Sequence, residues 1–244
     1  MMRKILYLCI FAGTLIGLAA CDDGRLYEDE SPIAVEGRTV NLLAHLSGVA
    51  SWPGPEYYVE LAGFGDDSEY ALISKAIPAP STEGGEVSIQ LAGIKDNVKR
   101  VELCVLNRLR KRVLSFYTIE EADLKASSTI NVDAGTLNVG MYHTMQERVF
   151  NTTCVNCHGA ATSAAAGLYL TEGLNYEALV GVPSVKMEGL HIVEPGKADE
   201  SVLYQALATD VSIAENWRYN HTAEVVNEDI LALIRTWINS GAKE

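Results

Sequence analysis

Three residues past the middle of the chain have the types and spacing of a covalent cofactor site. Cys154, Cys157 and His158 form a Cys-x-x-Cys-His motif. The spacing lets both sulfurs reach one edge of a porphyrin, while the histidine that follows can bind its iron. This is the attachment signature of c-type haem. We therefore predict a covalent haem c held by two thioether bonds, with His158 as one axial ligand of the iron.

Two other uses of such a cysteine pair stay open as alternatives. A dithiol redox motif normally opens a helix within a βαβ unit, whereas here a helical pattern precedes the motif and a small-residue loop follows it. A zinc site would need two further ligands, and the downstream His191 and His221 lack the short pairing of structural zinc fingers. Both alternatives fit the sequence less well than haem does.

The segments around the motif have helical periodicity. Val139, Tyr142, Met145 and Val149 share one face of a predicted helix that ends near Asn151. A second helix is predicted over residues 201–207. An apolar stripe predicts a last helix that ends at a Gly241 cap and packs against the first one; the stripe consists of Ile230, Leu233, Ile234, Trp237 and Ile238.

These flanks resemble a known domain. The matching stretches are Val149-Phe150, Gly167-Leu168-Tyr169-Leu170, Val193-Glu194-Pro195-Gly196, Ser201-Val202-Leu203-Tyr204 and the closing Ile230 to Ile238 helix with Gly241-Ala242. They resemble the C-terminal cytochrome c domain of planctomycete-type and Bacteroidota lipoproteins. The resemblance covers residues 136–244 and implies a small all-α haem domain, which we assign to residues 134–244.

The second axial ligand departs from that family. The resemblance implies a Met-Pro just before the last helix, but the corresponding residues 217–222 contain no methionine. His221 occupies this place, and a neutral imidazole is a good iron ligand, so we predict His221 as the distal ligand. Met187, His191 and an open sixth position are the alternatives. A pair of histidines predicts a low potential and leaves no vacant iron position, whereas an open position would favour a peroxidase-like or gas-binding role.

The region before the haem motif alternates with a period of two. Its strand-like stretches contain Val40, Leu42, Ala44 and Leu46; Tyr57, Val59 and Leu61; Val87, Ile89 and Leu91; and Val101, Leu103 and Val105. Turn-forming residues separate these stretches at spacings near ten residues. We predict about seven strands in an all-β antiparallel sandwich over residues 38–133, with Cys104 buried on a strand. The predicted fold is thus two-domain, with this sandwich followed by the all-α cytochrome c domain.

The first residues look like an export signal. Arg3 and Lys4 precede an apolar run over residues 5–20, which is too short to cross a membrane as a helix. The run closes on Leu-Ala-Ala-Cys, which resembles a bacterial lipoprotein signal. That resemblance implies removal of residues 1–20 and lipidation of Cys21. An ordinary cleaved signal and a short uncleaved anchor are the alternatives.

An acidic linker is predicted over residues 21–37. Its residues include Asp22, Asp23, Glu28, Asp29 and Glu30. An acidic run directly after a lipidated cysteine also resembles the surface-export signals of Bacteroidota lipoproteins. The predicted location is therefore the cell envelope, with a lipid anchor in the outer membrane and exposure at the cell surface if the acidic run is such a signal.

The charge balance narrows the function. With 19 Lys and Arg against 32 Asp and Glu, the formal net charge is −13, so nucleic acid is a poor partner. We predict a monohaem carrier of single electrons between redox partner proteins, rather than an enzyme, held to a membrane by its lipid. The alternatives are an envelope lipoprotein whose sandwich binds a protein or glycan, and a haem enzyme with an open iron position.

Overall fold

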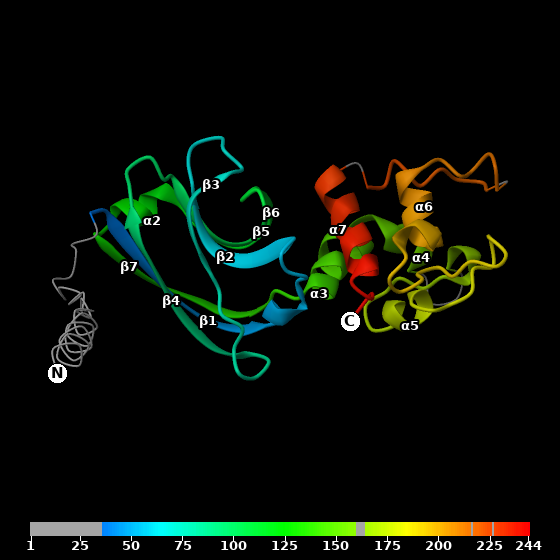
Figure 1. Ribbon diagram of the computed structural model, residues 1–244, viewed down its shortest axis with the longest axis horizontal. Helices are drawn as coiled ribbons and strands as arrows, with labels where there is room; N and C mark the ends of the chain where they lie inside the picture. The colour runs from blue at the N-terminus through cyan, green and yellow to red at the C-terminus, as the bar shows by residue number, and fades with distance from the viewer. Residues whose placement is uncertain (1–35, 160–163, 216, 226) are drawn as a thin grey trace, which may run out of the picture. The chain divides into compact units, whose positions relative to one another are not determined.

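The computed structural model describes residues 36–159, 164–215, 217–225 and 227–244 (Figure 1). The predicted signal peptide, the lipidation site Cys21 and nearly all of the acidic linker lie outside the described residues. Within the described ranges, no helix combines the length and the apolar character needed to cross a membrane.

The first half of the described chain consists of seven strands in two sheets, as the periodicity predicts (Figure 1). The strands are β1 (Arg38–Ser47), β2 (Tyr57–Phe64), β3 (Ala71–Ala76), β4 (Gly85–Ile94), β5 (Arg100–Asn107), β6 (Arg112–Ile119) and β7 (Thr129–Asn138). One sheet has the order β4-β1-β7 and the other has the order β3-β2-β5-β6.

One strand pair corrects the prediction of purely antiparallel pairing. β1 pairs antiparallel with β4 but parallel with β7. β7 lies along the other edge of β1 and runs in the same direction as β1. β7 also continues past Asp133, where the alternating pattern breaks in the sequence. Gly135 has a φ of +69° in the stretch where the register with β1 shifts, so a bulge at this glycine carries the strand on to Asn138.

The two sheets share a hydrophobic core. Alternate residues of β1 point into it, and Val40, Leu42, Ala44 and Leu46 are all buried. The same cluster contains side chains of the other sheet, such as Leu103. β5 is buried along nearly its whole length, and Cys104 is fully buried as predicted. Residues on both faces of β5 are therefore packed, whereas antiparallel strands commonly leave one face to solvent.

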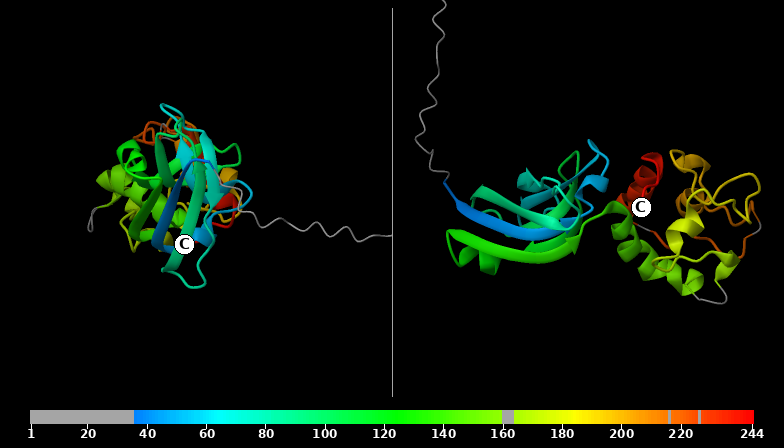
Figure 2. Two further views of the ribbon diagram at one scale, coloured as in Figure 1. Left: turned by 90° about the vertical axis from the view of Figure 1, so that its left-hand side faces the viewer. Right: turned by 90° about the horizontal axis from the view of Figure 1, so that it is seen from below.

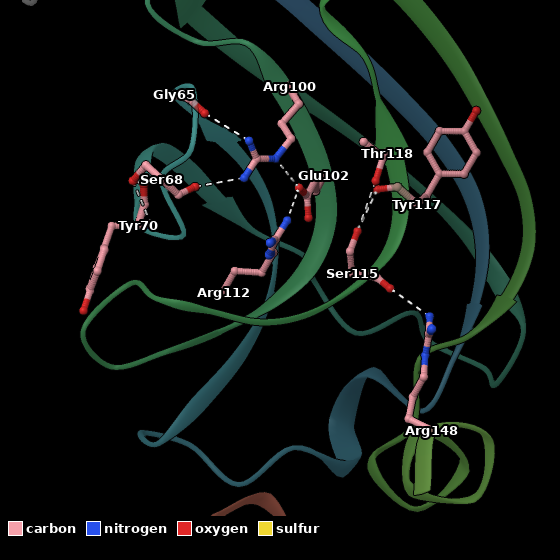
Figure 3. Close-up of polar contacts among 10 residues, drawn as sticks. All are labelled: Gly65, Ser68, Tyr70, Arg100, Glu102, Arg112, Ser115, Tyr117, Thr118 and Arg148. Carbon is pink, nitrogen blue, oxygen red and sulfur yellow. Dashed lines mark hydrogen bonds and ion pairs between the residues drawn. The ribbon is translucent and has the colours of Figure 1, made fainter. Parts of the chain in front are cut away.

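A buried carboxylate lies on the other face of the second sheet (Figure 3). Glu102 on β5 is 1% exposed and accepts hydrogen bonds from Arg100 Nε at 2.7 Å and Arg112 Nη1 at 2.6 Å. Arg100 also donates to the carbonyl oxygens of Gly65 and Ser68, which fixes the β2–β3 loop against β5. The two guanidinium groups compensate the charge that burial would otherwise make costly.

The second half of the described chain is helical. One short helix, α2 (Glu121–Lys125), lies earlier in the chain, between β6 and β7. The first helical stretch of the second half consists of α3 (Met141–Met145), η2 (Gln146–Cys154) and α4 (Val155–His158), which follow one another without a break. The predicted end near Asn151 is therefore wrong. A π-helical backbone in η2 carries the chain beyond Asn151, so the cysteine motif is itself helical.

The remaining helices of the described chain include the two that were predicted, α6 (Val202–Ala208) and α7 (Glu228–Asn239), and three short ones that were not. These three are η3 (Ala165–Gly167), α5 (Asn175–Leu179) and η4 (Ala198–Glu200). In α7 the predicted stripe is buried, apart from the half-buried Ile230. Trp237 meets Tyr142 of α3 with ring centroids 5.3 Å apart, as the expected packing requires. After α7, Gly241 N and Ala242 N donate to Ile238 O and Trp237 O, which caps the helix.

The chain passes from β7 directly into the first helical stretch (Figure 2), and side-chain hydrogen bonds fix this passage. The indole Nε1 of Trp52 donates to Val139 O at 2.6 Å, and the hydroxyl of Ser51, at the end of η1 (Val49–Ser51), accepts from Met141 N at 2.8 Å. A Cβ on Gly48 would lie 2.3 Å from Gly140 Cα, so the two backbones touch. The helix that leads to the motif therefore starts from a defined point on the β region.

Candidate haem-binding site

The three motif residues lie together at the end of the first helical stretch. Cys154 ends η2, and Cys157 and His158 belong to α4. Residues three and four positions apart lie on the same side of a helix, so all three side chains leave the helix on one side. Cys154 is half-buried, whereas Cys157 is exposed. Both are free thiols, available for bonding to a further group.

A backbone carbonyl fixes the ring of His158. The Nδ1 atom lies 3.0 Å from Ala165 O. A carbonyl oxygen only accepts, so Nδ1 carries the proton, and Nε2 of the neutral ring has a free lone pair. Histidines that bind metals usually donate their other N–H to a carbonyl or carboxylate in this way. His158 is therefore in the tautomer that binds a metal through Nε2.

The end of the motif helix packs against the segment that follows it. Leu170 N donates to His158 O at 2.8 Å, and Thr171 Oγ1 donates to Gly159 O at 3.2 Å. A Cβ on Gly159 would lie only 2.5 Å from Val155 O. The residue after the histidine must therefore be glycine for the helix to end in this geometry.

The structure brings His221 next to His158. Their ring centroids are 6.3 Å apart, and the ring planes differ by 33°. A metal–imidazole bond is about 2.0 Å long, so two imidazoles on opposite sides of one ion have centroids about 6 Å apart. The observed separation of 6.3 Å is close to this value. A direct hydrogen bond between the rings would require a shorter separation.

The surroundings of His221 suit a neutral ligand. Burial is the largest cause that lowers the pKa of His221 below its ordinary value of 6.5, and the nearby His158 is the second. The ring is therefore neutral at pH 7. His221 Nδ1 and the indole Nε1 of Trp217 are both buried, and neither has a hydrogen-bond partner among the described residues. Buried polar atoms normally have a hydrogen-bond partner. These two atoms therefore indicate a further polar group that the described residues do not supply.

The other two candidates for the distal ligand are placed differently. Met187 lies in a turn where its backbone N, like that of Lys186, donates to Ser184 Oγ. His191 Nδ1 is paired with the carboxylate of Glu194. The carbonyl of His191 accepts from Val202 N, which fixes this residue to the start of α6. Among the three candidates, His221 is the residue whose side chain is found next to the ring of His158.

The geometry also bears on the two alternative uses of the cysteines. Burial raises the pKa of the Cys154 thiol, whereas a redox-active thiol needs a lowered pKa. No group of three or more His, Cys, Asp or Glu side chains converges as a metal site in the part of the chain that the structure describes.

Three contributors to this site were not anticipated. Trp217 and Tyr219 meet the ring of His221 nearly at right angles, with centroids 5.6 Å and 5.1 Å away. Both are close to His221 in the sequence, so their position was a usable signal. The carbonyl of Ala165 gave no such signal, because any residue type offers the same backbone acceptor.

No protein-family model matches the chain, and no curated protein matches it.

Proposed function

We propose that this protein is a monohaem c-type cytochrome that carries single electrons. Its fold would then be a β-sandwich followed by a cytochrome c domain, with haem c bound to Cys154 and Cys157. The observation that carries this proposal is the pair of histidine rings, 6.3 Å apart, beside two free cysteines on the same helix. His158 belongs to the motif itself, and His221 is the histidine from a later part of the sequence whose ring lies beside it.

Each residue has a defined part in the proposed site. Cys154 and Cys157 would hold the porphyrin covalently, and His158 and His221 would bind its iron. The Ala165 carbonyl keeps the Nδ1 proton on His158, so Nε2 stays available. Bound haem would supply one-electron chemistry at its iron. Cys157 is exposed, so the edge of the site where it lies is open to a redox partner.

Two histidine ligands also favour a carrier over an enzyme. Imidazole on both sides leaves no iron position for peroxide or oxygen, and it lowers the potential relative to a methionine ligand. We further propose that the chain is exported, that Cys21 carries the lipid, and that residues 21–37 hold the folded part away from the membrane. Its partners would then be redox proteins of the cell envelope. Replacement of Cys21 by serine should move the protein from the membrane fraction to the soluble fraction.

The deciding experiment is the production of the full chain in a bacterium that has a c-type haem maturation system. We expect haem to stay bound through denaturing electrophoresis and the ferrous protein to show the sharp bands of a six-coordinate low-spin haem. Cys154→Ala and Cys157→Ala should each lose one thioether bond, and the double variant should lose covalent haem. The matched control is Cys104→Ala, whose thiol is buried in the β region.

The ligand assignment has its own test. His221→Met should keep the covalent haem, raise the reduction potential and add the absorption band of an iron–methionine bond. A colourless wild-type protein would refute the cytochrome proposal as a whole. An unchanged spectrum in His221→Met would refute His221 as ligand while leaving haem attachment in place.

A further inference from the structure

The distal histidine is surrounded by aromatic rings that hold its plane. Trp217 and Tyr219 lie at interplanar angles of 88° and 87° to the ring of His221. Such edge-to-face contacts are a preferred geometry of aromatic pairs, and they add to stability beyond the buried area. Rotation of the imidazole about its bond to the chain would break both contacts. The two neighbours therefore restrict the ring to one orientation.

Tyr219 is itself held in place. It is 52% exposed, so burial alone does not position it, but its hydroxyl donates to the carboxylate of Glu224. Glu224 N donates in turn to His221 O at 3.0 Å. Glu224 is thus bonded both to the ring that contacts His221 and to the backbone of His221. The three residues form one connected unit on the distal side.

The other aromatic neighbour has a separate support. Trp217 N donates to Ser212 O at 2.8 Å. On either side of His221 in the sequence, Thr222 N and Thr222 Oγ1 both donate to Asn220 Oδ1 at 2.9 Å, which closes a turn at His221. The backbone on either side of His221 is therefore fixed independently of any contact with His158.

We propose that Tyr219, held by Glu224, and Trp217 are positioning residues that set the imidazole plane of His221 relative to that of His158. The inference rests on the proposed function, because it assigns these residues a role toward the haem iron. The protein then fixes the angle between the two axial ring planes near the 33° of this structure. It also keeps His221 close to the iron when another ligand competes for the same position.

Two readouts on the matured, haem-loaded protein test the proposal. The angle between axial imidazole planes determines the splitting of the g values of low-spin ferric iron in electron paramagnetic resonance. Tyr219→Ala should shift these g values, and Tyr219→Phe, which keeps the ring, should largely restore them. Cyanide competes with the distal ligand, so its affinity for the ferric protein should rise about five- to tenfold in Tyr219→Ala, as expected from the loss of one aromatic contact.

The matched control is Tyr70→Ala. Tyr70 is exposed to the same degree as Tyr219, at 53%, but lies in the β region. The Tyr70→Ala variant should change neither the g values nor the affinity for cyanide. Wild-type spectra in Tyr219→Ala, with haem attached and His221 bound, would overturn the positioning role and leave the proposed function intact. Absence of haem from the wild-type protein would instead refute the proposed function itself.

Discussion

At the scale of single residues, the described chain places ionised groups where neighbours of opposite charge compensate them. The strongest case is Glu102, which is buried on β5 between Arg100 and Arg112 (Figure 3). The ring of Phe64 also lies within 5.3 Å and 5.7 Å of the two guanidinium carbons. Loss of the carboxylate would leave two cations without their counter-charge beside an apolar ring, although Arg100 would keep the carbonyl oxygens of Gly65 and Ser68.

Glu102→Ala should therefore lower the free energy of unfolding by about 3 kcal/mol, the cost of breaking a buried ion pair. Glu102→Gln keeps an oxygen acceptor for the arginines and should lose less. Urea denaturation followed by circular dichroism measures both. The control is Lys197→Ala, which removes an exposed ion pair with Glu200 and should have no measurable effect. Equal stability of Glu102→Ala and the wild type would contradict this account.

A second residue-scale prediction concerns acid sensitivity. Hydrogen bonds from Lys125 and then Lys99 lower the pKa of Glu121 from its ordinary value of 4.5 to about 2. A carboxylate with a lowered pKa in the folded state stabilises the protein above its unfolded-state pKa, and that stability is lost as the pH falls toward the folded-state value.

Unfolding at a series of pH values tests this. Between about pH 4.5 and pH 2, the wild type should lose more stability than Glu121→Gln, whose side chain does not titrate. Because the side chain is 39% exposed, the difference should shrink in high salt. Parallel pH profiles for the two proteins would show that the lysines do not stabilise the folded state through Glu121.

At the scale of elements, the motif helix matters most. Its π-helical part extends the helix to His158, and its end is held by Leu170 and Thr171. Gly159 allows this end, since a methyl group there would meet the carbonyl oxygen of Val155 at 2.5 Å. The geometry of the helix end thus determines where the ring of His158 lies.

Gly159→Ala should disturb that end. We expect a loss of about 1–3 kcal/mol in unfolding free energy, as for other overpacked sites, and a smaller yield of covalent haem. Gly65→Ala is the control, because a Cβ there makes only ordinary contacts with Leu72 and Asn97. Denaturation and haem quantification on matched preparations provide the measurement. The same haem yield and stability in Gly159→Ala and Gly65→Ala would refute the role given to Gly159.

At the scale of the whole molecule, residues 35–244 form one compact unit. One hydrophobic cluster contains residues of the sheets, such as Leu42 and Leu103, together with Met145 and Trp237 of the helical part. A 2.7 Å ion pair between Lys111 and Asp229 joins the β5–β6 turn to α7. The strands and the helices are therefore in direct contact with each other.

This continuity predicts one cooperative unfolding transition. Far-ultraviolet circular dichroism, which reports the strands and helices, and haem absorbance, which reports the motif, should have the same midpoint in a denaturant titration. Two transitions separated by a plateau would show that the β region and the helical region unfold independently.

The sequence determined most of the local structure. Period-two alternation predicted β1, β2, β4 and β5, and the spacing of the turn residues predicted about seven strands in all. The stripe that ends at Ile238 predicted the last helix, because side-chain burial follows the backbone period. The Cys-x-x-Cys-His spacing identified the candidate site, since its chemistry depends on neighbouring residues alone.

Only the tertiary structure decided how distant segments meet. The parallel pairing of β1 with β7 and the contact of the His158 ring with that of His221 both join residues far apart in the chain. Such contacts depend on how the whole core closes, and no local period encodes them. The tertiary structure also decided that this helix ends at His158. Residues 170 and 171 pack against the helix end, and this packing outweighs the weak helix propensity of the local sequence.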